Sequence, residues 1–243
     1  MTKGRHQDHR VSLQPAFILH GRAYGDTSRL LDVFTRDYGR IALVAKGARS
    51  PRSRLQGILQ VFTPLVISWS GKGEVQTLTG AETIKTTINI SGKNIISGYY
   101  INELLQRLVT QHDPHPELYD IYQKTLQGFS FEDAELVLRR FEKYLLAEIG
   151  YGLSLEYETE NGEAIVKDEI YYYDIETGPK NIRHGEHSEA LSVSGQTLID
   201  LENEKFSSAQ SQKEAKQLMR IILSHHLGGK PLKTRNIHWY KPL

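Results

Sequence analysis

The sequence predicts an α+β protein, in which an N-terminal small β-barrel is followed by an all-helical domain with a small β-rich insertion. Three observations lead to this fold class. Short runs of alternating apolar residues, separated by turn residues, continue to about residue 82. From about residue 94 the apolar residues recur at helical spacing. Residues 153–194 break that spacing, because they are acidic, rich in tyrosine and interrupted by glycines.

Five short strands account for the first part of the chain. Turns at residues 37–39 and 71–73 contain glycines, which supply the positive φ that tight hairpins need. Leu65, Ile67 and Trp69 share one face by the period-two rule and should point into a core. Five strands in roughly 70 residues favour a closed barrel, because closure leaves no exposed edge. The expected strands are 16–20, 28–35, 40–46, 61–69 and 74–78.

Helices should dominate the rest of the chain. The apolar spacing predicts helices from about residue 94 to a stop at Asp113-Pro114, and then over 117–127, 132–149, 195–203 and 211–226. Strands or a ribbon are expected within 153–194. The domain prediction is therefore a disordered basic arm over 1–14, a barrel domain over 15–85 and a helical domain over 86–243 that contains this insertion.

Composition excludes several classes of site. The chain has no cysteine, which excludes disulfides, thiolate zinc sites, iron–sulfur clusters and cysteine nucleophiles. No apolar run is long enough for a transmembrane helix, and the polar N-terminus does not resemble a secretory signal, so we expect a cytoplasmic protein without a membrane partner.

Catalytic motifs are also missing from the sequence. No phosphate-binding Walker loop, nucleophile elbow, zinc-protease motif or dinucleotide fingerprint occurs, and we expect no cofactor, no metal and no enzymatic activity. His184 and His187 are interpreted as solvated loop residues. The carboxylates at 156, 158, 160 and 163 are interpreted as a solvated face, with a buried acid/base pair, and hence a hydrolase, as the alternative.

The charge is strongly segregated along the chain, although the formal net charge is only +1. Residues 1–72 carry a net +8, residues 129–205 a net −11, and residues 206–243 a net +6. Such a distribution indicates that different surfaces meet partners of different charge. The alternative is an uneven surface that serves solubility alone.

The most informative basic segment follows the third expected strand. Residues 46–54 carry four cations in nine positions with Gly, Ser and Pro between them, which predicts a flexible loop that contacts phosphates. Tyr24, Tyr38 and Trp69 are nearby candidates for stacking on bases, although for Tyr38 and Trp69 the core is the favoured interpretation. The residues predicted to contact nucleic acid are Arg22, Arg40, Lys46, Arg49, Arg52, Arg54 and Lys72, with Lys233 and Arg235 near the C-terminus as a further basic pair.

Several separated motifs resemble one known family. Residues 16–65, followed by GKGEVQTL, YYINELL, LRRFEKYLLAEIGYG and LGGKPLKTR in that order, closely resemble the RecO family of bacterial recombination mediators. The resemblance covers almost the whole chain from about Pro15. It implies an N-terminal OB barrel that binds single- and double-stranded DNA, followed by a helical domain. It also implies a cytoplasmic, nucleoid-associated protein.

The resemblance also implies partners and an activity. Members anneal complementary strands and, with RecR, help to load RecA onto DNA coated by the single-stranded DNA-binding protein, whose acidic C-terminal tail they contact. Positions matching the motifs implicated in that contact lie on two expected helices: Arg139, Arg140 and Phe141 on one, and Lys216 and Arg220 on the other. The alternative for the first two is a surface ion pair with Glu135, Glu142 or Glu148.

Two departures from the family pattern stand out. Many relatives carry a four-cysteine zinc module where this chain has residues 153–194. Because this chain has no cysteine, we expect no zinc site there. The first 14 residues extend beyond the usual start of the family. Since OB barrels accept either nucleic acid, an RNA-binding OB-fold protein stays as the alternative function.

Overall fold

A computed structural model describes residues 10–181, except 86, 87, 89, 91 and 93, and residues 191–236. The chain divides into two compact units, one up to Ser130 and one from Phe131. Each unit is described by itself. Among the described residues no helix is both long and apolar enough to cross a membrane.

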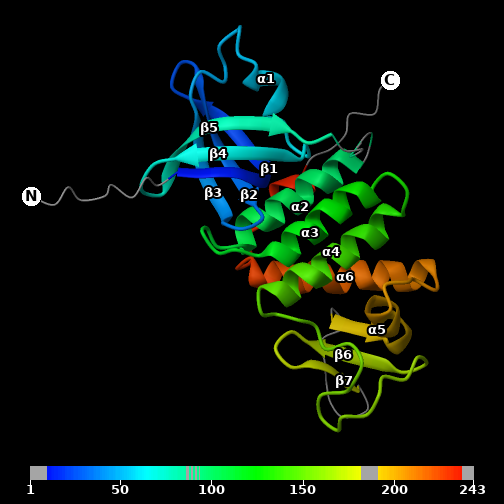
Figure 1. Cartoon of the computed structure of the whole chain (residues 1–243). Helices are drawn as coiled ribbons and strands as arrows, with labels where there is room; N and C mark the ends of the chain where they lie inside the picture. The colour runs from blue at the N-terminus through cyan, green and yellow to red at the C-terminus, as the bar shows by residue number, and fades with distance from the viewer. Residues whose placement is uncertain are drawn as a thin grey trace, which may run out of the picture. The chain divides into compact units, whose positions relative to one another are not determined.

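A closed five-stranded barrel forms the start of the first unit (Figure 1). Its strands follow the order β1-β2-β3-β5-β4, and the parallel pairing of β3 with β5 closes it. This confirms the predicted barrel, which is OB-like. The strands are β1 (Arg10–Tyr24), β2 (Ser28–Thr35), β3 (Gly39–Ala45), β4 (Leu65–Ser70) and β5 (Val75–Thr83).

Alternation along the strands builds the barrel core. Leu65, Ile67 and Trp69 of β4 are all at most 2% exposed, as their spacing predicts. Ile41 and Leu43 of β3 point inward in the same way. A four-residue helix, α1 (Leu55–Ile58), follows β3 and was not expected from the sequence, because one turn is too short to show a period.

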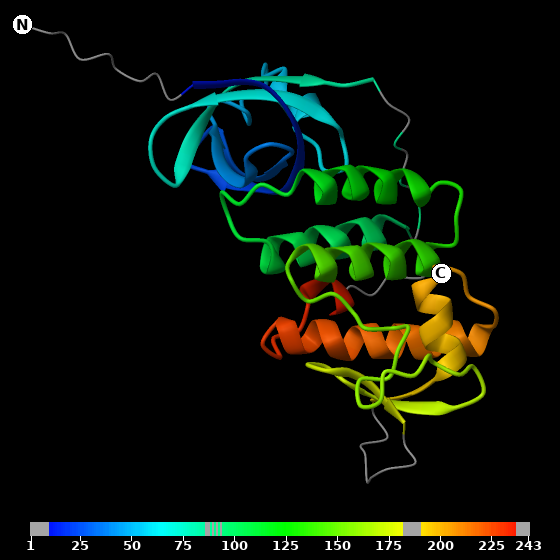
Figure 2. The same ribbon diagram turned by 60° about the horizontal axis from the view of Figure 1, so that its bottom comes forward.

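The first strand is much longer than predicted. Its first part pairs with β4 and its second part with β2, with a register shift between Ile18 and His20. β1 therefore curves around the barrel, as the dark blue strand in Figure 2 shows. Residues 10–14 belong to this strand and not to a disordered arm, which corrects the prediction for them. The rest of the predicted arm, residues 1–9, lies outside the described residues.

Two helices complete the first unit: α2 (Asn94–Leu108) and α3 (Pro116–Gly128). The buried amide of Asn102 donates to the Leu19 carbonyl of β1 at 2.8 Å and accepts from the Tyr122 hydroxyl at 2.6 Å. Phe17 and Phe34 of the barrel pack against the Tyr119 and Tyr122 rings of α3. Because these contacts join α2 and α3 to the barrel, the compact unit extends to Ser130. The predicted boundary at residue 85 marks instead the change from strands to helices.

In its described residues the second unit combines three α-helices with a small sheet. The helices are α4 (Ala134–Glu148), α5 (Gly195–Glu202) and α6 (Ala209–His226), and the 3-10 turn η3 (Lys233–Asn236) follows α6. Asp133, Ser194 and Ser208 cap the three helices with side-chain oxygens. The sheet has the order β7-β6-β8 and lies alongside α6 (Figures 1 and 2). Its strands are β6 (Ile170–Asp174), β7 (Gly178–Asn181) and β8 (Ser192–Ser194).

This sheet is the β-rich insertion that the sequence predicts. Tyr171 and Tyr173 alternate inward along β6 and are buried, whereas Ile170 is half exposed. The tyrosine run thus supplies a local apolar core, without any cysteine. Residues 182–190 of the predicted insertion lie outside the described residues.

Candidate nucleic-acid interface and partner groove

The basic loop, defined as residues 46–54, leaves the barrel at the end of β3. All four of its cations are exposed: Lys46, Arg49, Arg52 and Arg54. Between them Ala48 is fully buried in the barrel core. Ala48 thus anchors the loop to the barrel, while the positively charged side chains point to solvent.

The backbone of the basic loop is ordered by hydrogen bonds, in contrast to the flexible loop that we expected. The Arg49 N–H donates to the Thr27 carbonyl at 2.7 Å, and its guanidinium reaches the Gly25 carbonyl at 3.2 Å. Ser50 and Ser53 donate to carbonyls within the loop at 3.0 and 2.9 Å. The loop is therefore a series of turns docked on the β1–β2 hairpin.

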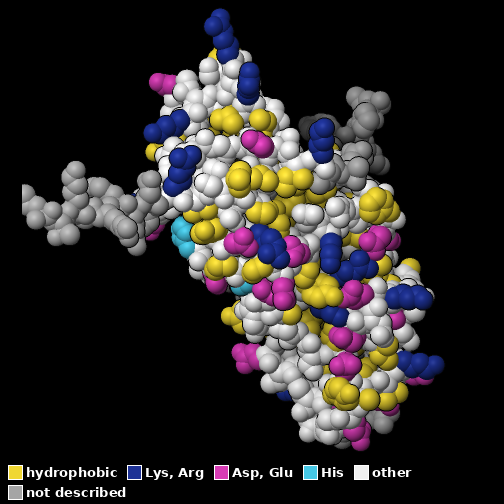
Figure 3. Space-filling view, viewed as in Figure 1, with side chains coloured by type: hydrophobic (Ala, Val, Ile, Leu, Met, Phe, Trp, Pro, Cys, Tyr) yellow, Lys and Arg dark blue, Asp and Glu magenta, His cyan; other side chains and the backbone are white. Residues whose placement is uncertain are grey.

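That hairpin adds two further exposed groups to the same end of the barrel. Arg22 is exposed near the end of β1, and the Tyr24 ring is 51% exposed at its last position. Lys and Arg side chains outnumber acidic ones over this part of the surface (Figure 3). No acidic group among the described residues pairs with Arg22, Lys46, Arg52 or Arg54. The end of the barrel thus combines unpaired cations with one accessible aromatic ring.

Arg40 differs from the other predicted DNA-binding residues. Its guanidinium donates to the carbonyls of Leu105, Gln106 and Val109 at the end of α2, and its Nε lies 3.2 Å from Asp32 Oδ1. Burial raises the pKa of Asp32, and Arg40 offsets part of this rise. Arg40 therefore neutralises a helix C-terminus and a half-buried carboxylate inside the unit, and its guanidinium is engaged there and not on the exposed loop.

Lys72, Tyr38 and Trp69 lie apart from the basic loop. Lys72 is exposed in the β4–β5 hairpin, next to the end of β4, which pairs with the start of β1. Trp69 is 2% exposed and meets Tyr38 edge to face at 5.3 Å between ring centroids, while Tyr38 is 42% exposed. The Trp69 side chain thus belongs to the core, and Tyr38 offers an accessible ring.

The first set of predicted partner-binding residues is engaged within α4 and its surroundings. Arg139 is 6% exposed and donates to Glu142 at 2.6 Å, and Phe141 is fully buried. Arg140 pairs with Glu132 at 3.1 Å and with Glu204 at 2.9 Å. These three side chains form internal contacts rather than an open surface.

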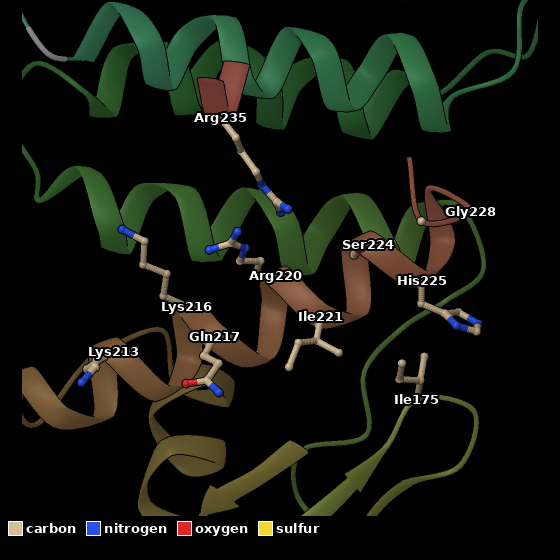
Figure 4. A pocket seen from close by; sticks show the side chains of 11 residues that line it. Ile175, Lys213, Lys216, Gln217, Arg220, Ile221, Ser224, His225, Gly228 and Arg235 are labelled. Atoms are coloured by element: carbon tan, nitrogen blue, oxygen red, sulfur yellow. The ribbon is translucent and has the colours of Figure 1, made fainter. Parts of the chain in front are cut away.

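The second set lies in an open groove beside α6, which we call the α6 groove. The groove has a volume of about 1060 Å³, and four cations line it: Lys213, Lys216, Arg220 and Arg235. Arg220 of α6 and Arg235 of η3 extend toward the same space (Figure 4). Ile221 and Ile175 add apolar surface.

Few acidic groups compensate these cations. Lys216 donates to Glu135 at 2.7 Å, but no carboxylate in the described parts of the chain pairs with Lys213, Arg220 or Arg235. Arg235, which we predicted to bind DNA, belongs to this groove. Its companion Lys233 is not among the lining residues. Lys213 was not among the predicted residues, although Lys213, Lys216 and Arg220 follow helical spacing and so share one face.

The acidic candidates do not form a paired site. Glu156, Glu160 and Glu163 are exposed, and the buried Glu158 accepts from the Asn181 amide at 3.4 Å. Within the described residues no group of three or more His, Asp or Glu side chains could hold a metal ion. The predicted loop histidines His184 and His187 lie outside the described residues.

Comparison with known proteins gives a consistent result over both units. Residues 10–87 match the family model described as "Recombination protein O N terminal", and residues 91–236 match "Recombination protein O C terminal". Proteins named "DNA repair protein RecO" are similar over nearly the full chain. The protein from Burkholderia lata is 45% identical over 96% of this chain and 84% of its own length.

Two further relatives carry the same name. The protein from Aromatoleum aromaticum is 42% identical over 95% of this chain and 96% of its own length. The protein from Methylococcus capsulatus is 44% identical over 94% of this chain and 93% of its own length. The likeness therefore extends over both units and over almost the whole of these relatives.

Proposed function

Because the chain belongs to the RecO family of DNA repair proteins, we propose that it is a non-enzymatic recombination mediator that binds single- and double-stranded DNA and anneals complementary strands. With RecR, it would help to load RecA onto DNA coated by the single-stranded DNA-binding protein. Its place would be the cytoplasm, at the nucleoid.

One observation carries the DNA-binding part of this proposal. The basic loop presents Lys46, Arg49, Arg52 and Arg54 on ordered turns, without acidic partners among the described residues. Because the backbone of the loop is already ordered and its cations have no acidic partners, contact with phosphates costs little backbone entropy and breaks no ion pair. Phosphate contacts carry no sequence information, so the proposed binding tolerates every sequence, as annealing of arbitrary strands requires.

The salt dependence of binding tests this interface. For a single strand, log affinity falls against log salt by about 0.7 per phosphate contact. The combined change of Arg49, Arg52 and Arg54 to Ala should therefore make the slope shallower by about 2. A control with Lys124, Lys167 and Lys205 changed to Ala removes equal charge elsewhere and should keep the slope. An unchanged slope in the loop variant would exclude this DNA site, and equal binding of matched RNA would favour the RNA-binding alternative.

The α6 groove supports a second part of the proposal, the capture of the acidic tail of the single-stranded DNA-binding protein. An acidic peptide with an apolar end needs cations for its carboxylates and an apolar wall beside them. Lys213, Arg220 and Arg235 provide the cations, and Ile221 with Ile175 provides the wall. The buried Arg139 does not line the groove, so its removal would act through stability.

Binding of a tail peptide tests whether the α6 groove is the site of tail capture. The Arg220→Ala, Arg235→Ala double variant should weaken binding of a labelled acidic tail peptide by tenfold or more, since hydrogen bonds to charged groups are worth about 1.5–3 kcal/mol each. Lys167→Ala, which removes an exposed cation of the same unit, should leave it unchanged. Fluorescence anisotropy measures both, and equal affinity of the double variant and the unchanged protein would contradict the groove assignment.

Annealing is the activity that unites the two surfaces. Complementary oligonucleotides coated by the cognate single-stranded DNA-binding protein should pair faster in the presence of this protein. Removal of the acidic tail should abolish the acceleration on coated strands and keep it on naked strands. Failure to accelerate either reaction would contradict the annealing function.

A further inference from the structure

A second, smaller cavity lies in the barrel unit at the end of β1 opposite to the basic loop. It has a volume of about 320 Å³ and forms where the first residues of β1, the end of β4 and the start of β5 meet the β2–β3 turn. This volume is at the lower end of the range for small-molecule pockets, roughly 300–1,000 Å³. The cavity is therefore large enough for one small organic group.

The walls of this cavity are apolar and aromatic. Trp69 and Ile41, both nearly fully buried, belong to the barrel core and line the cavity. Tyr38 forms one side, and its edge-to-face contact with Trp69 at 88° holds its ring in place. Since Tyr38 is 42% exposed, part of its ring is accessible to a ligand.

Two side chains at the cavity offer hydrogen bonds of either sense. The Gln76 amide both donates and accepts, and so does the neutral His112 imidazole. Neither Gln76 nor His112 pairs with another side chain in the part of the chain that the structure describes. Such groups can adapt to the polar edge of any nucleobase.

His112 is also held in an uncommon conformation. Its backbone φ is +62°, a value that residues other than Gly rarely adopt. Its backbone N–H donates to the Arg40 carbonyl at 2.9 Å. Arg40 in turn is fixed at the end of α2. The loop that places His112 at the cavity is therefore rigid, and the polar lining is formed before a ligand arrives.

A cation completes the site. Arg10 lines the cavity, is exposed, and has no carboxylate partner among the described residues. Ser70, the partner of Arg10 in the β1–β4 register, lies two residues before the exposed Lys72. Arg10 thus places an unpaired cation at an aromatic cavity, as a base with its neighbouring phosphate would require.

From these features we propose that the cavity binds one unstacked nucleobase of a single strand, with the adjoining phosphate on Arg10. The inference rests on the proposed DNA binding and adds a site that the basic loop does not contain. The base would stack on Tyr38 and present its polar edge to Gln76 and His112. Because both polar groups can donate or accept, every base would fit, and the binding of the strand would stay independent of sequence.

The Trp69 indole provides a direct reporter of occupancy. The chain has two tryptophans, and changing Trp239 to Phe leaves Trp69 as the single one. Addition of an oligothymidylate to this full-length variant should quench Trp69 emission. The same backbone with abasic sites should bind through its phosphates without quenching. Thymidine monophosphate tests whether a free nucleotide also enters, and quenching by it would support the same cavity.

Substitutions separate the cavity from the basic loop. Tyr38→Ala should weaken binding of the normal strand by about tenfold and leave the abasic strand unaffected, since stacking of one base is lost. Tyr38→Phe keeps the ring and should bind as the unchanged protein does. Tyr157→Ala is the matched control, because it removes a 54% exposed ring outside the barrel unit and should keep both the affinity and the quenching.

The outcomes distinguish this inference from the proposed function. In one outcome the strand binds with the expected salt dependence, but it does not quench Trp69, and Tyr38→Ala binds the strand as tightly as the unchanged protein does. This outcome would overturn the base site and leave DNA binding by the basic loop in place. If the strand does not bind at all, both fail. Tyr38→Ala also loses the ring contact with Trp69, so its thermal unfolding is measured beside that of Tyr38→Phe. If Tyr38→Ala is unfolded at the assay temperature, the quenching of Trp69 in the protein that keeps Tyr38 decides the proposal.

Discussion

At the scale of the residue, burial and pairing separate cations that look equivalent in the sequence. Arg40 and Arg49 both lie in the basic first third of the chain, but Arg40 closes the end of α2 and Arg49 lies on the exposed loop. Similarly, Arg139 is buried against Glu142, while Arg220 lines an open groove. The sequence predicts the charge at each position, and it does not predict which carbonyl or carboxylate a distant segment brings to it.

Changing Arg40 to Ala should therefore affect folding rather than the salt dependence of DNA binding. The α2 carbonyls lose their donor, and Asp32 stays half-buried without its counterion. We expect a loss of about 2–3 kcal/mol in the free energy of unfolding, measured with urea. Arg52→Ala should cost less than about 0.5 kcal/mol. A stable Arg40→Ala protein with a shallower salt slope would instead place Arg40 in the interface.

Asp200 should contribute stability that depends on pH. Burial alone would raise its pKa, but hydrogen bonds from Ser207, Ser211 and Gln196 outweigh this and keep the pKa below its ordinary value. A lowered pKa in the folded state means that the stabilisation is present above about pH 4 and is lost as the pH falls through the folded pKa.

Asp200→Asn should consequently lower the free energy of unfolding by about 1–2 kcal/mol at pH 7, and by less in acid. Urea unfolding between pH 3 and pH 7 would measure the difference. Asp168→Asn, at a carboxylate whose side chain is 82% exposed, is the control and should change little. A difference for Asp200→Asn that does not shrink in acid would contradict the assigned role.

At the scale of the element, periodicity predicted the strands and helices well where one face is buried. β2 spans the predicted residues 28–35, and α4 and α6 lie within two residues of the expected bounds. β1 exceeds its prediction on both sides, because its first residues pair with β4 and residues 21–24 pair with β2, and neither pairing can be read from the segment itself. The sequence did not predict that the basic loop is ordered, because the carbonyls of Gly25 and Thr27 that accept its hydrogen bonds lie in the distant β1–β2 hairpin.

The β2–β3 turn shows how closely two elements approach. Gly39 has a φ of +65°, and a Cβ atom there would lie 2.1 Å from the Asp113 carbonyl oxygen of the α2–α3 loop. Gly39→Ala should therefore destabilise the unit by about 3 kcal/mol or more. Gly25→Ala has a similar φ of +57° but no neighbour within 4 Å, and should cost only about 1–2 kcal/mol. Equal costs in urea unfolding would contradict the clash.

At the scale of the whole molecule, the change from strands to helices does not coincide with the division into compact units. The sequence predicted the first at about residue 85, but the aromatic and amide contacts that add α2 and α3 to the barrel unit join residues about 80 to 105 positions apart. Periodicity describes one segment at a time. It therefore predicted the helices and could not predict their partners.

Two units with separate surfaces should respond separately to substitution. Changing Arg220 and Arg235 of the α6 groove should keep the affinity for a naked strand and lower that for a strand coated by the single-stranded DNA-binding protein. Changing the basic loop should lower both. Electrophoretic mobility shifts on naked and coated strands measure these affinities, and a groove variant that loses naked-strand binding would contradict the separation.

The position of the basic loop and the α6 groove in different units has a further consequence for a coated strand. When the acidic tail of the single-stranded DNA-binding protein occupies the α6 groove, the DNA coated by that protein is tethered to the present chain. The contact between this DNA and the basic loop then becomes intramolecular. The effective concentration of DNA at the barrel is then set by the tether, in the millimolar range for short flexible links, rather than by the amount of DNA in solution. Two individually weak contacts would thus suffice for tight engagement, and either one could be released first.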